Sequence, residues 1–146
     1  MIENVINRLN FLIDKTPSLL IQISEDKLSE KPARNKWSKK EIIGHLVDSA
    51  TNNHHRFVRA QFETNPEICY NQNEWNKCSY YQQIDSKQII LFWTVYNRQL
   101  IEIIKRIPKE NLKRQIKVGD NLLSIEFLIT DYVAHIEHHL KQVFDY

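Results

Sequence analysis

The segment SIEFLITDYVAHIEHHLKQVF, residues 124–144, decides the fold class of this chain. Its apolar residues recur every three or four positions, which is the spacing of one face of an α-helix and not the alternation of a strand. Ser124 is a favourable N-cap directly before the first of them. The residues expected to face the core are Ile125, Leu128, Ile129, Tyr132, Val133, Ile136, Leu140 and Val143. The segment therefore predicts a long amphipathic helix at the end of the sequence.

Two earlier segments show the same spacing. Residues 2–24 predict one helix, which Pro17 is expected to bend or interrupt. The sequence SKKE at residues 38–41 has the form of a capping box, in which a hydroxyl and a carboxylate satisfy the first free amides of a helix. It predicts the start of a second helix, which Thr64-Asn65-Pro66 should end.

A fourth helical segment lies between these and the last one. Asp85 is its expected N-cap, and the apolar spacing continues to Ile107, before Pro108. A long, aromatic-rich connection, residues 65–84, joins the second and third helices, and Gly119-Asp120 predicts a turn before the last one. Four long helices with one long connection predict an all-α protein with a four-helix bundle.

The composition is that of a globular protein. Hydrophobic residues make up 42% and charged residues 26% of the 146 positions, and no abrupt change divides them, so we expect a single domain over residues 1–146. Twenty basic and 18 acidic side chains leave a net charge of +2 with no basic stripe, which argues against a nucleic-acid partner. The N-terminus does not resemble a signal peptide and no apolar run is long enough to span a bilayer, so we expect no membrane partner and a cytoplasmic location.

A pair of histidines in the last helix predicts a metal site. His135 and His139 are four residues apart, which stacks their side chains on one face of the helix. This is the spacing of the HExxH metal site, but Glu137 is not in the position of that motif's general base. His138 is an alternative partner for His135 at a spacing of three. Such pairs also occur by chance, so a third ligand is needed.

His45 is the expected third ligand. It lies among inward-facing apolar residues of the second helix, beside Gly44, whose presence within a helix suggests close packing or room for a ligand. His54 and His55 are too far along the same helix to reach the same ion as His45. Three histidines leave a coordination position open for water or substrate, as in catalytic zinc sites. Imidazole nitrogens bind zinc, nickel, copper and iron alike, so the ligands alone do not name the divalent ion. We expect zinc or nickel first, with iron or manganese as alternatives.

The motifs together resemble those of a known family. Trp37-Ser38-Lys39-Lys40-Glu41, Gly44-His45-Leu46-Val47-Asp48 and the run from His135 to Gln142 are similar, in order and spacing, to those of the DinB superfamily. The segment Tyr70 to Trp75 is also similar to one found in some members. The resemblance covers nearly the whole chain, and it implies an up-down-down-up bundle with a metal ion held by His45, His135 and His139.

The resemblance also implies a range of activities. A metal-dependent enzyme acting on a small molecule is the first expectation, either a transferase that uses a low-molecular-weight thiol or a hydrolase. The alternative is a non-catalytic bundle that binds a metal or a small ligand in a structural or stress-associated role. A di-iron protein is excluded because the sequence contains no ExxH pair.

Residues other than the ligands are open at this point. Asp48, Asp131 and Gln142 are each one helical turn from a predicted ligand and could orient it or transfer a proton, but each could equally be a solvated or capping group. We therefore assign no catalytic residue. The aromatic residues Trp75, Tyr80, Tyr81 and Trp93 suggest a surface that a homodimer would cover, unless the long connection folds back over its own bundle.

Overall fold

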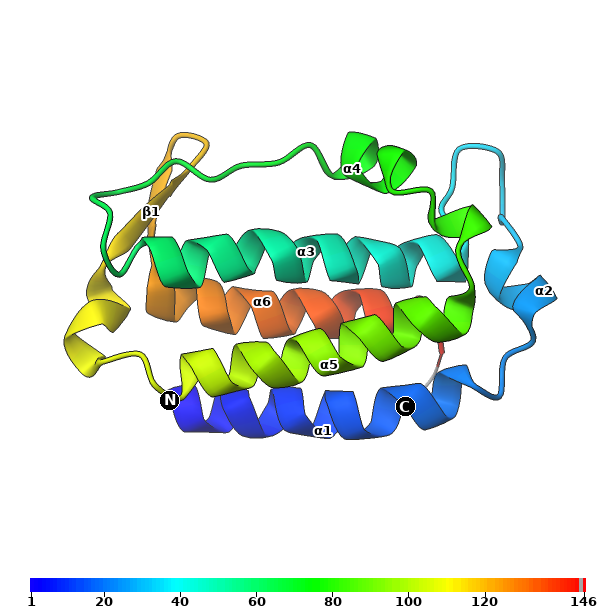
Figure 1. The fold of residues 1–146 in the computed structure, drawn as a ribbon, viewed down its shortest axis with the longest axis horizontal. Coiled ribbons are helices and arrows are strands. Elements are labelled where there is room, and N and C mark those ends of the chain that lie inside the picture. The colour runs from blue at the N-terminus through cyan, green and yellow to red at the C-terminus, as the bar shows by residue number, and fades with distance from the viewer. Residues whose placement is uncertain (145) are drawn as a thin grey trace.

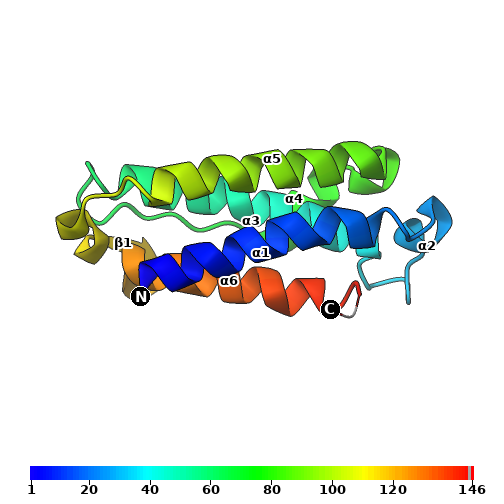
Figure 2. The same ribbon diagram turned by 90° about the horizontal axis from the view of Figure 1, so that it is seen from below.

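Four long helices form the bundle. The computed structural model describes residues 1–144 and 146, and its long helices are α1 (Ile2–Leu20), α3 (Lys39–Arg59), α5 (Ser86–Ile104) and α6 (Ile125–Leu140). Helices α1 and α6 run in one direction along the long axis, and α3 and α5 run in the other (Figure 1). Both α1 and α3 pack against α5 and α6, so the four helices lie side by side (Figure 2). The all-α class, the four-helix bundle and its up-down-down-up order are confirmed.

The predicted helix starts are also confirmed. Ser38 Oγ accepts a hydrogen bond from the Glu41 amide at 3.1 Å, and the Ser38 amide donates to Glu41 Oε1 at 3.1 Å, which completes the capping box of α3. Asp85 caps α5 through the amide of Lys87. Ser124 caps α6 in the same way. Each side chain satisfies an amide that has no partner within its own helix.

All four long helices end a few residues before the predicted ends; α5 ends at Ile104 and not Ile107, and α6 ends at Leu140. Helix α1 ends at Leu20, and Ser24 caps a separate short helix, α2 (Glu25–Ser29). Helix α3 ends at Arg59, several residues before the predicted stop at 64–66. The Arg114 guanidinium donates to the carbonyl oxygen of Ala60, so a side chain from far along the sequence satisfies the end of this helix.

A β-hairpin replaces the simple turn expected near Gly119. Strands β1 (Gln115–Val118) and β2 (Asn121–Ser124) pair antiparallel, and Ile116 lies opposite Leu123. Gly119 has φ +60°, the left-handed conformation that glycine adopts without strain. Four-residue strands in which few side chains are buried carry too little pattern to be recognised in the sequence. A short 3₁₀ helix, η2 (Lys109–Lys113), joins α5 to the hairpin.

The connection between α3 and α5 crosses the length of the bundle outside α3 (Figure 1). It contains α4 (Gln72–Cys78) and the 3₁₀ turn η1 (Tyr81–Gln83), and hydrogen bonds tie it to α3. Tyr81 donates to Asp48 Oδ1 at 2.5 Å, and the Asn76 amide donates to the carbonyl oxygen of Glu41 at 2.9 Å. In the described part of the chain, no helix is both long and apolar enough to cross a membrane.

Candidate metal centre

Three histidines from two antiparallel helices meet at one end of the bundle. His45 lies near the start of α3, and His135 and His139 lie in the second half of α6. Because α3 and α6 are in contact and run in opposite directions, the start of one lies beside the end of the other. The structure therefore brings together the three histidines predicted from the sequence, although His45 and His135 are 90 positions apart along the chain.

The distances suit a single ion. Nε2 of His45 and Nε2 of His135 are 3.0 Å apart, and one nitrogen from each of the three rings lies within 4.8 Å of the other two. Two nitrogens bound to one tetrahedral zinc, each at 2.0–2.1 Å from it, are about 3.4 Å apart. The observed spacing brackets this value, so small side-chain rotations would place all three rings around a common ion.

The outward nitrogens of two rings have partners. His139 Nδ1 is 2.9 Å from Oε1, the side-chain carbonyl oxygen of Gln142, and His135 Nδ1 is 3.5 Å from Ser49 Oγ. A carbonyl oxygen can only accept, so the proton of His139 is on Nδ1 and the Nε2 lone pair is available to a cation. Hydrogen bonds of this kind fix the tautomer and orientation of metal-binding imidazoles. His45 Nδ1 is buried and has no hydrogen-bond partner among the described residues.

The electrostatics favour neutral rings. Burial, followed by the nearby His135 and His139, lowers the pKa of His45 to about 3. Burial and the neighbouring His139 and His138 lower the pKa of His135 to about 4, and burial also lowers the pKa of His139. Neutral imidazole is the form that binds a metal ion, so the three rings are ready to act as ligands near pH 7.

The centre opens into a cavity of about 480 Å³, the histidine cavity, whose lining includes His139, Gln142, Ile42 and Asn73. Trp37 forms one wall, and the centroid of its ring lies 4.8 Å from that of His45. A small molecule in this cavity can therefore approach the histidines from one side, while His45 is fully buried on the other.

The remaining candidates lie elsewhere. The ring of His54 is 2.8 Å from the hydroxyl of Tyr96, and His55 is exposed, so neither belongs to the cluster. His138 is exposed and is not part of the group that could hold an ion, so the spacing of four, and not of three, brings the histidines together. Of the three possible orienting residues, Gln142 contacts a histidine and Asp131 is exposed.

Asp48 has a different environment. It is buried and accepts the Tyr81 hydroxyl, while its second oxygen has no partner among the described residues. Burial raises its pKa to about 6, although the hydrogen bond from Tyr81 acts in the opposite direction. Asp48 thus holds the long connection on α3.

The sequence does not predict the roles of two residues near the centre. Trp37 stands only as part of a motif, and Ser49 has no signal at all, because a contact with a histidine on another element leaves no trace in local spacing. A signal was available for Trp37: a large aromatic residue directly before the N-cap of the helix that carries His45.

Comparisons with known proteins agree with this geometry. The family model described as the DinB superfamily matches residues 8–143. Two relatives are named as proposed metal-dependent hydrolases. One is BH0277 of Halalkalibacterium halodurans, 26% identical over 97% of this chain and 84% of its own length. The other is YfiT of Bacillus subtilis, 20% identical over 90% of this chain and 78% of its own length.

Solved structures show the same fold. The structure of YfiT from Bacillus subtilis, described as having an unusual four-helix bundle topology, superposes with a TM-score of 0.88 at 19% identity, covering 97% of this chain and 82% of that one. A DinB-like protein, YjoA, from Bacillus subtilis gives a TM-score of 0.68 at 18% identity, covering 97% of this chain and 87% of that one.

Proposed function

The chain belongs to the DinB superfamily, and from this premise we propose that it is a metal-dependent hydrolase of a small molecule, with the ion held by His45, His135 and His139. One observation carries the proposal. Three imidazoles, at least two of them held neutral by their surroundings, converge, and one of them, His139, lines a cavity large enough for a small substrate. The names of the relatives BH0277 and YfiT support the same reaction class.

The donor set defines what the residues of this chain do. His45, His135 and His139 would hold the ion through three nitrogens, fewer than the four ligands of a structural zinc site, and His139 also lines the histidine cavity. A divalent ion bound there would supply Lewis acidity, which would lower the pKa of water and polarise the bond to be hydrolysed. Gln142 keeps His139 in the tautomer that presents Nε2 to the ion. Trp37 shields the His45 side from bulk water. Zinc or nickel is the proposed metal, with iron or manganese as alternatives.

Two alternatives to hydrolysis remain predictions, one catalytic and one not. Thiol-dependent group transfer would use the same open position for a thiolate. A non-catalytic bundle would bind the ion without turning over a substrate. Both are outcomes of the experiment below.

The test begins with metal analysis of protein purified without a histidine tag. We expect one equivalent of a divalent ion, and a hydrolysis of small esters, amides or phosphoesters that a chelator abolishes and the ion restores. His139→Ala should lose both the ion and the activity, whereas the neighbouring His138→Ala should keep both. Turnover only in the presence of an added thiol would replace hydrolysis with group transfer, and a bound ion without either activity would favour the non-catalytic bundle.

We also propose a homodimer, although two of the aromatic residues that suggest it in the sequence are not exposed. Trp93 is 0% exposed because it lies in the core of the bundle, and Tyr81 is 8% exposed because the long connection folds back over α3. Instead, α5 exposes an apolar face with Leu91, Phe92 and Val95 at 63%, 53% and 56%. Sedimentation equilibrium at micromolar concentration should show a dimer, and Leu91→Glu should shift it toward monomer. A wild-type protein that sediments only as monomer would overturn this proposal.

A further inference from the structure

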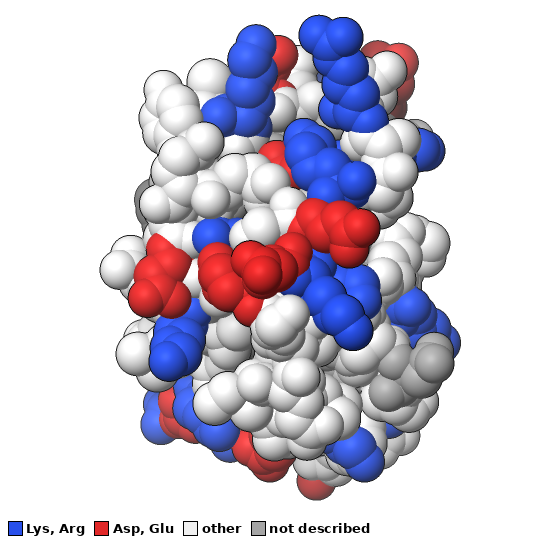
Figure 3. Space-filling model, turned by 90° about the vertical axis from the view of Figure 1, so that its right-hand side faces the viewer, with Lys and Arg blue, Asp and Glu red and all other residues white. Residues whose placement is uncertain are grey.

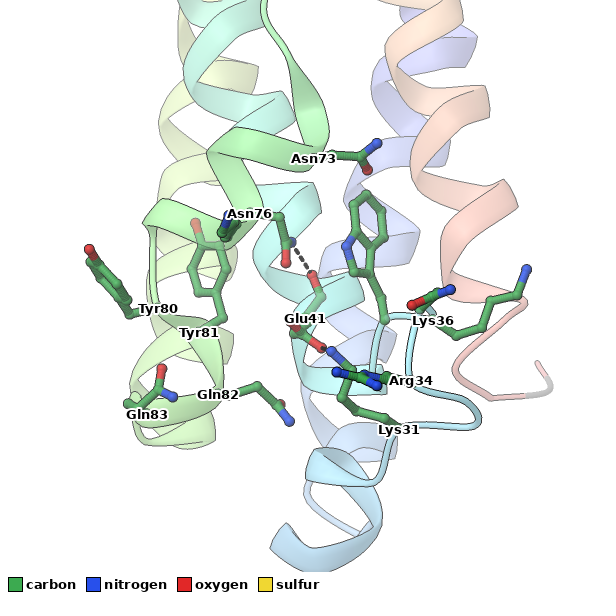
Figure 4. Close-up of a pocket in the computed structure, with 13 residues that line it drawn as sticks. Lys31, Arg34, Lys36, Glu41, Asn73, Asn76, Tyr80, Tyr81, Gln82 and Gln83 are labelled. Atoms are coloured by element: carbon green, nitrogen blue, oxygen red, sulfur yellow. Dashed lines mark hydrogen bonds and ion pairs between the residues drawn. The ribbon is translucent and has the colours of Figure 1, made fainter.

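A second cavity, the basic cavity, lies beside the metal centre. It has a volume of about 510 Å³ and lies between the loop that precedes α3 and the segment formed by α4 and η1 (Figure 4). Four of its lining residues are basic, and one is acidic. They are Lys31, Arg34, Lys36 and Lys77, with Glu41.

The single acidic residue of the lining, Glu41, already has hydrogen-bond and ion-pair partners within the chain. Glu41 Oε1 accepts the Ser38 amide in the capping box and pairs with Lys31 at 3.3 Å. Among the described residues, Arg34, Lys36 and Lys77 make no ion pair. The cavity therefore carries an excess of positive charge that nothing in the described part of the chain neutralises.

The surrounding surface carries Lys and Arg on both sides of a band of Asp and Glu (Figure 3). Figure 3 views the end of the bundle at which α2 lies. Lys and Arg predominate in its upper part, the α4 side of the molecule, and Asp and Glu form a band across the middle. In Figure 4, Lys31 and Arg34 lie together beside Glu41, while Lys36 extends away from them on the side of α6. An anion in the cavity would thus meet Lys31 and Arg34 together on the side of Glu41 (Figure 4).

The basic cavity and the histidine cavity share lining residues. Asn35, Lys36, Trp37 and Asn73 line both this cavity and the histidine cavity. The ring of Trp37 lies 4.8 Å from that of His45 and 6.5 Å from that of His139. One small molecule can therefore lie along Trp37, with one end at the histidines and the other among the basic side chains.

We propose that the basic cavity is a subsite for an oxyanionic group, a carboxylate or a phosphate, that the substrate carries apart from the bond to be hydrolysed. Arg34 is the principal anchor, because its planar guanidinium can donate two parallel hydrogen bonds to such a group. Lys36, which lines both cavities, orients the substrate between them. Recognition of a substrate here rests on the proposed function, but binding of an anion does not.

Binding can be tested on metal-free protein, which removes the ion as a competing site for anions. The indole N–H signals are followed by NMR at pH 7.5 and constant ionic strength, with inorganic phosphate and, separately, malonate as probes. We expect a saturable shift of the Trp37 signal, assigned with Trp37→Phe, and none of Trp93, which is buried in the core. The anion that binds more tightly identifies the group.

Matched variants identify the residues. Arg34→Ala and Lys36→Ala should each weaken binding at least about fivefold, since a charge-assisted contact contributes on this scale. Lys109→Ala, an exposed lysine of η2 at the opposite end of the bundle, should leave it unchanged. No saturable shift, or an equal loss with Lys109→Ala, would overturn the proposal.

The two proposals fail separately. A protein that binds metal and hydrolyses esters but binds neither probe retains its function and has no anion subsite. A protein that binds phosphate through Arg34 but holds no metal has the subsite and lacks the proposed centre. If both stand, Arg34→Ala should raise KM for a carboxylate-bearing substrate and leave KM for its neutral methyl ester unchanged.

Discussion

Gln142 orients His139 from just beyond the end of α6. Its side-chain carbonyl accepts the Nδ1 proton at 2.9 Å, which turns Nε2 toward the other two histidines. Ser49, on α3, lies in the corresponding place for His135 at 3.5 Å. Orienting contacts of this kind raise the basicity of the ligand and reduce the freedom it loses on binding.

Replacing the orienting amide should weaken metal binding without abolishing it. For Gln142→Ala we expect the affinity for zinc to fall about 10- to 100-fold, because His139 would be free to rotate and to change tautomer. Competition against a chromophoric chelator measures this change. Lys141→Ala, at the exposed neighbouring position, is the control and should bind as tightly as the wild type. Equal affinities for all three proteins would show that Gln142 has no orienting role.

The buried histidines also make the stability of the metal-free protein depend on pH. The pKa values of His45 and His135 in the fold are about 3 and about 4, because of burial and neighbouring rings. In the unfolded chain they return to about 6.5. Between these values the unfolded state binds more protons, so the stability is full above about pH 6.5 and is lost as the pH falls. The raised pKa of Asp48, about 6, makes the folded state bind the extra proton and so opposes this loss of stability. It opposes it with one group, whereas two histidines cause it.

We therefore expect the urea midpoint of metal-free protein to decrease between pH 7 and pH 5. Each of the two histidines should contribute a slope that increases through this window and approaches about 1.4 kcal/mol per pH unit near pH 5. His45→Ala should show a shallower slope than the wild type, whatever its absolute stability. His55→Ala removes an exposed ring and serves as the control. A slope that does not change in His45→Ala would mean that His45 is not held neutral by the fold.

At the scale of elements, the packing of η1 against α3 depends on Gly44. A Cβ atom at this position would lie 2.2–2.5 Å from ring atoms of Tyr81, which is far inside van der Waals contact. The hydroxyl of the same tyrosine donates a hydrogen bond to Asp48, one helical turn after Gly44. The ring therefore cannot move away without breaking that hydrogen bond. The glycine that the sequence associated with close packing therefore allows the long connection to lie directly on the helix that carries His45.

Gly44→Ala should destabilise the protein even though alanine is the better helix former. The gain in helix propensity is about 1 kcal/mol, whereas forcing extra volume into a packed contact costs about 1–3 kcal/mol. Urea unfolding of Gly44→Ala, Tyr81→Ala and the double variant measures the coupling. The double variant should lose less than the sum of the two single losses, since Tyr81→Ala removes the clash. Additive losses would show that the residue at position 44 and the Tyr81 ring do not clash.

At the scale of the molecule, the core of the bundle is separate from the proposed metal centre, and we expect the two to contribute to stability independently. The core between the four helices contains large, fully buried side chains from every long helix. These include Leu9, Leu12, Ile13, Ile43, Leu46, Trp93, Leu100, Ile125 and Tyr132. The histidines lie at one end of this core and do not replace any part of it. This differs from a zinc finger, where the ion substitutes for a core.

Removing the metal should therefore leave the bundle folded. We expect dialysis against a chelator to preserve the helical circular dichroism signal and to lower the free energy of unfolding only by the contribution of ligand binding, about 2.7 kcal/mol where the ion was present at 100 times its dissociation constant. His139→Ala should have the same helical content with and without added zinc. A loss of helical signal on chelation would show that the ion has a structural role.

The sequence by itself determined the four long helices, three of their N-caps and the identity of the converging histidines. These features depend on local spacing: apolar periodicity, a hydroxyl three residues before a carboxylate, and histidines one helical turn apart. Pairing His45 with the two histidines of α6 needed only the further expectation that inward-facing positions of a bundle meet. The direction of each helix came from the resemblance to a family and not from spacing.

The tertiary structure alone decided the features that depend on contacts between distant residues. Helix α3 ends where the Arg114 guanidinium donates a hydrogen bond to the carbonyl oxygen of Ala60, and Trp93 is buried because the bundle closes around it. The hairpin of β1 and β2 is too short to show a pattern. The two cavities that share Trp37 form only where the loop before α3 meets α4 and α6. Local spacing cannot specify such contacts, because they join segments whose separation in sequence has no fixed relation to their distance in space.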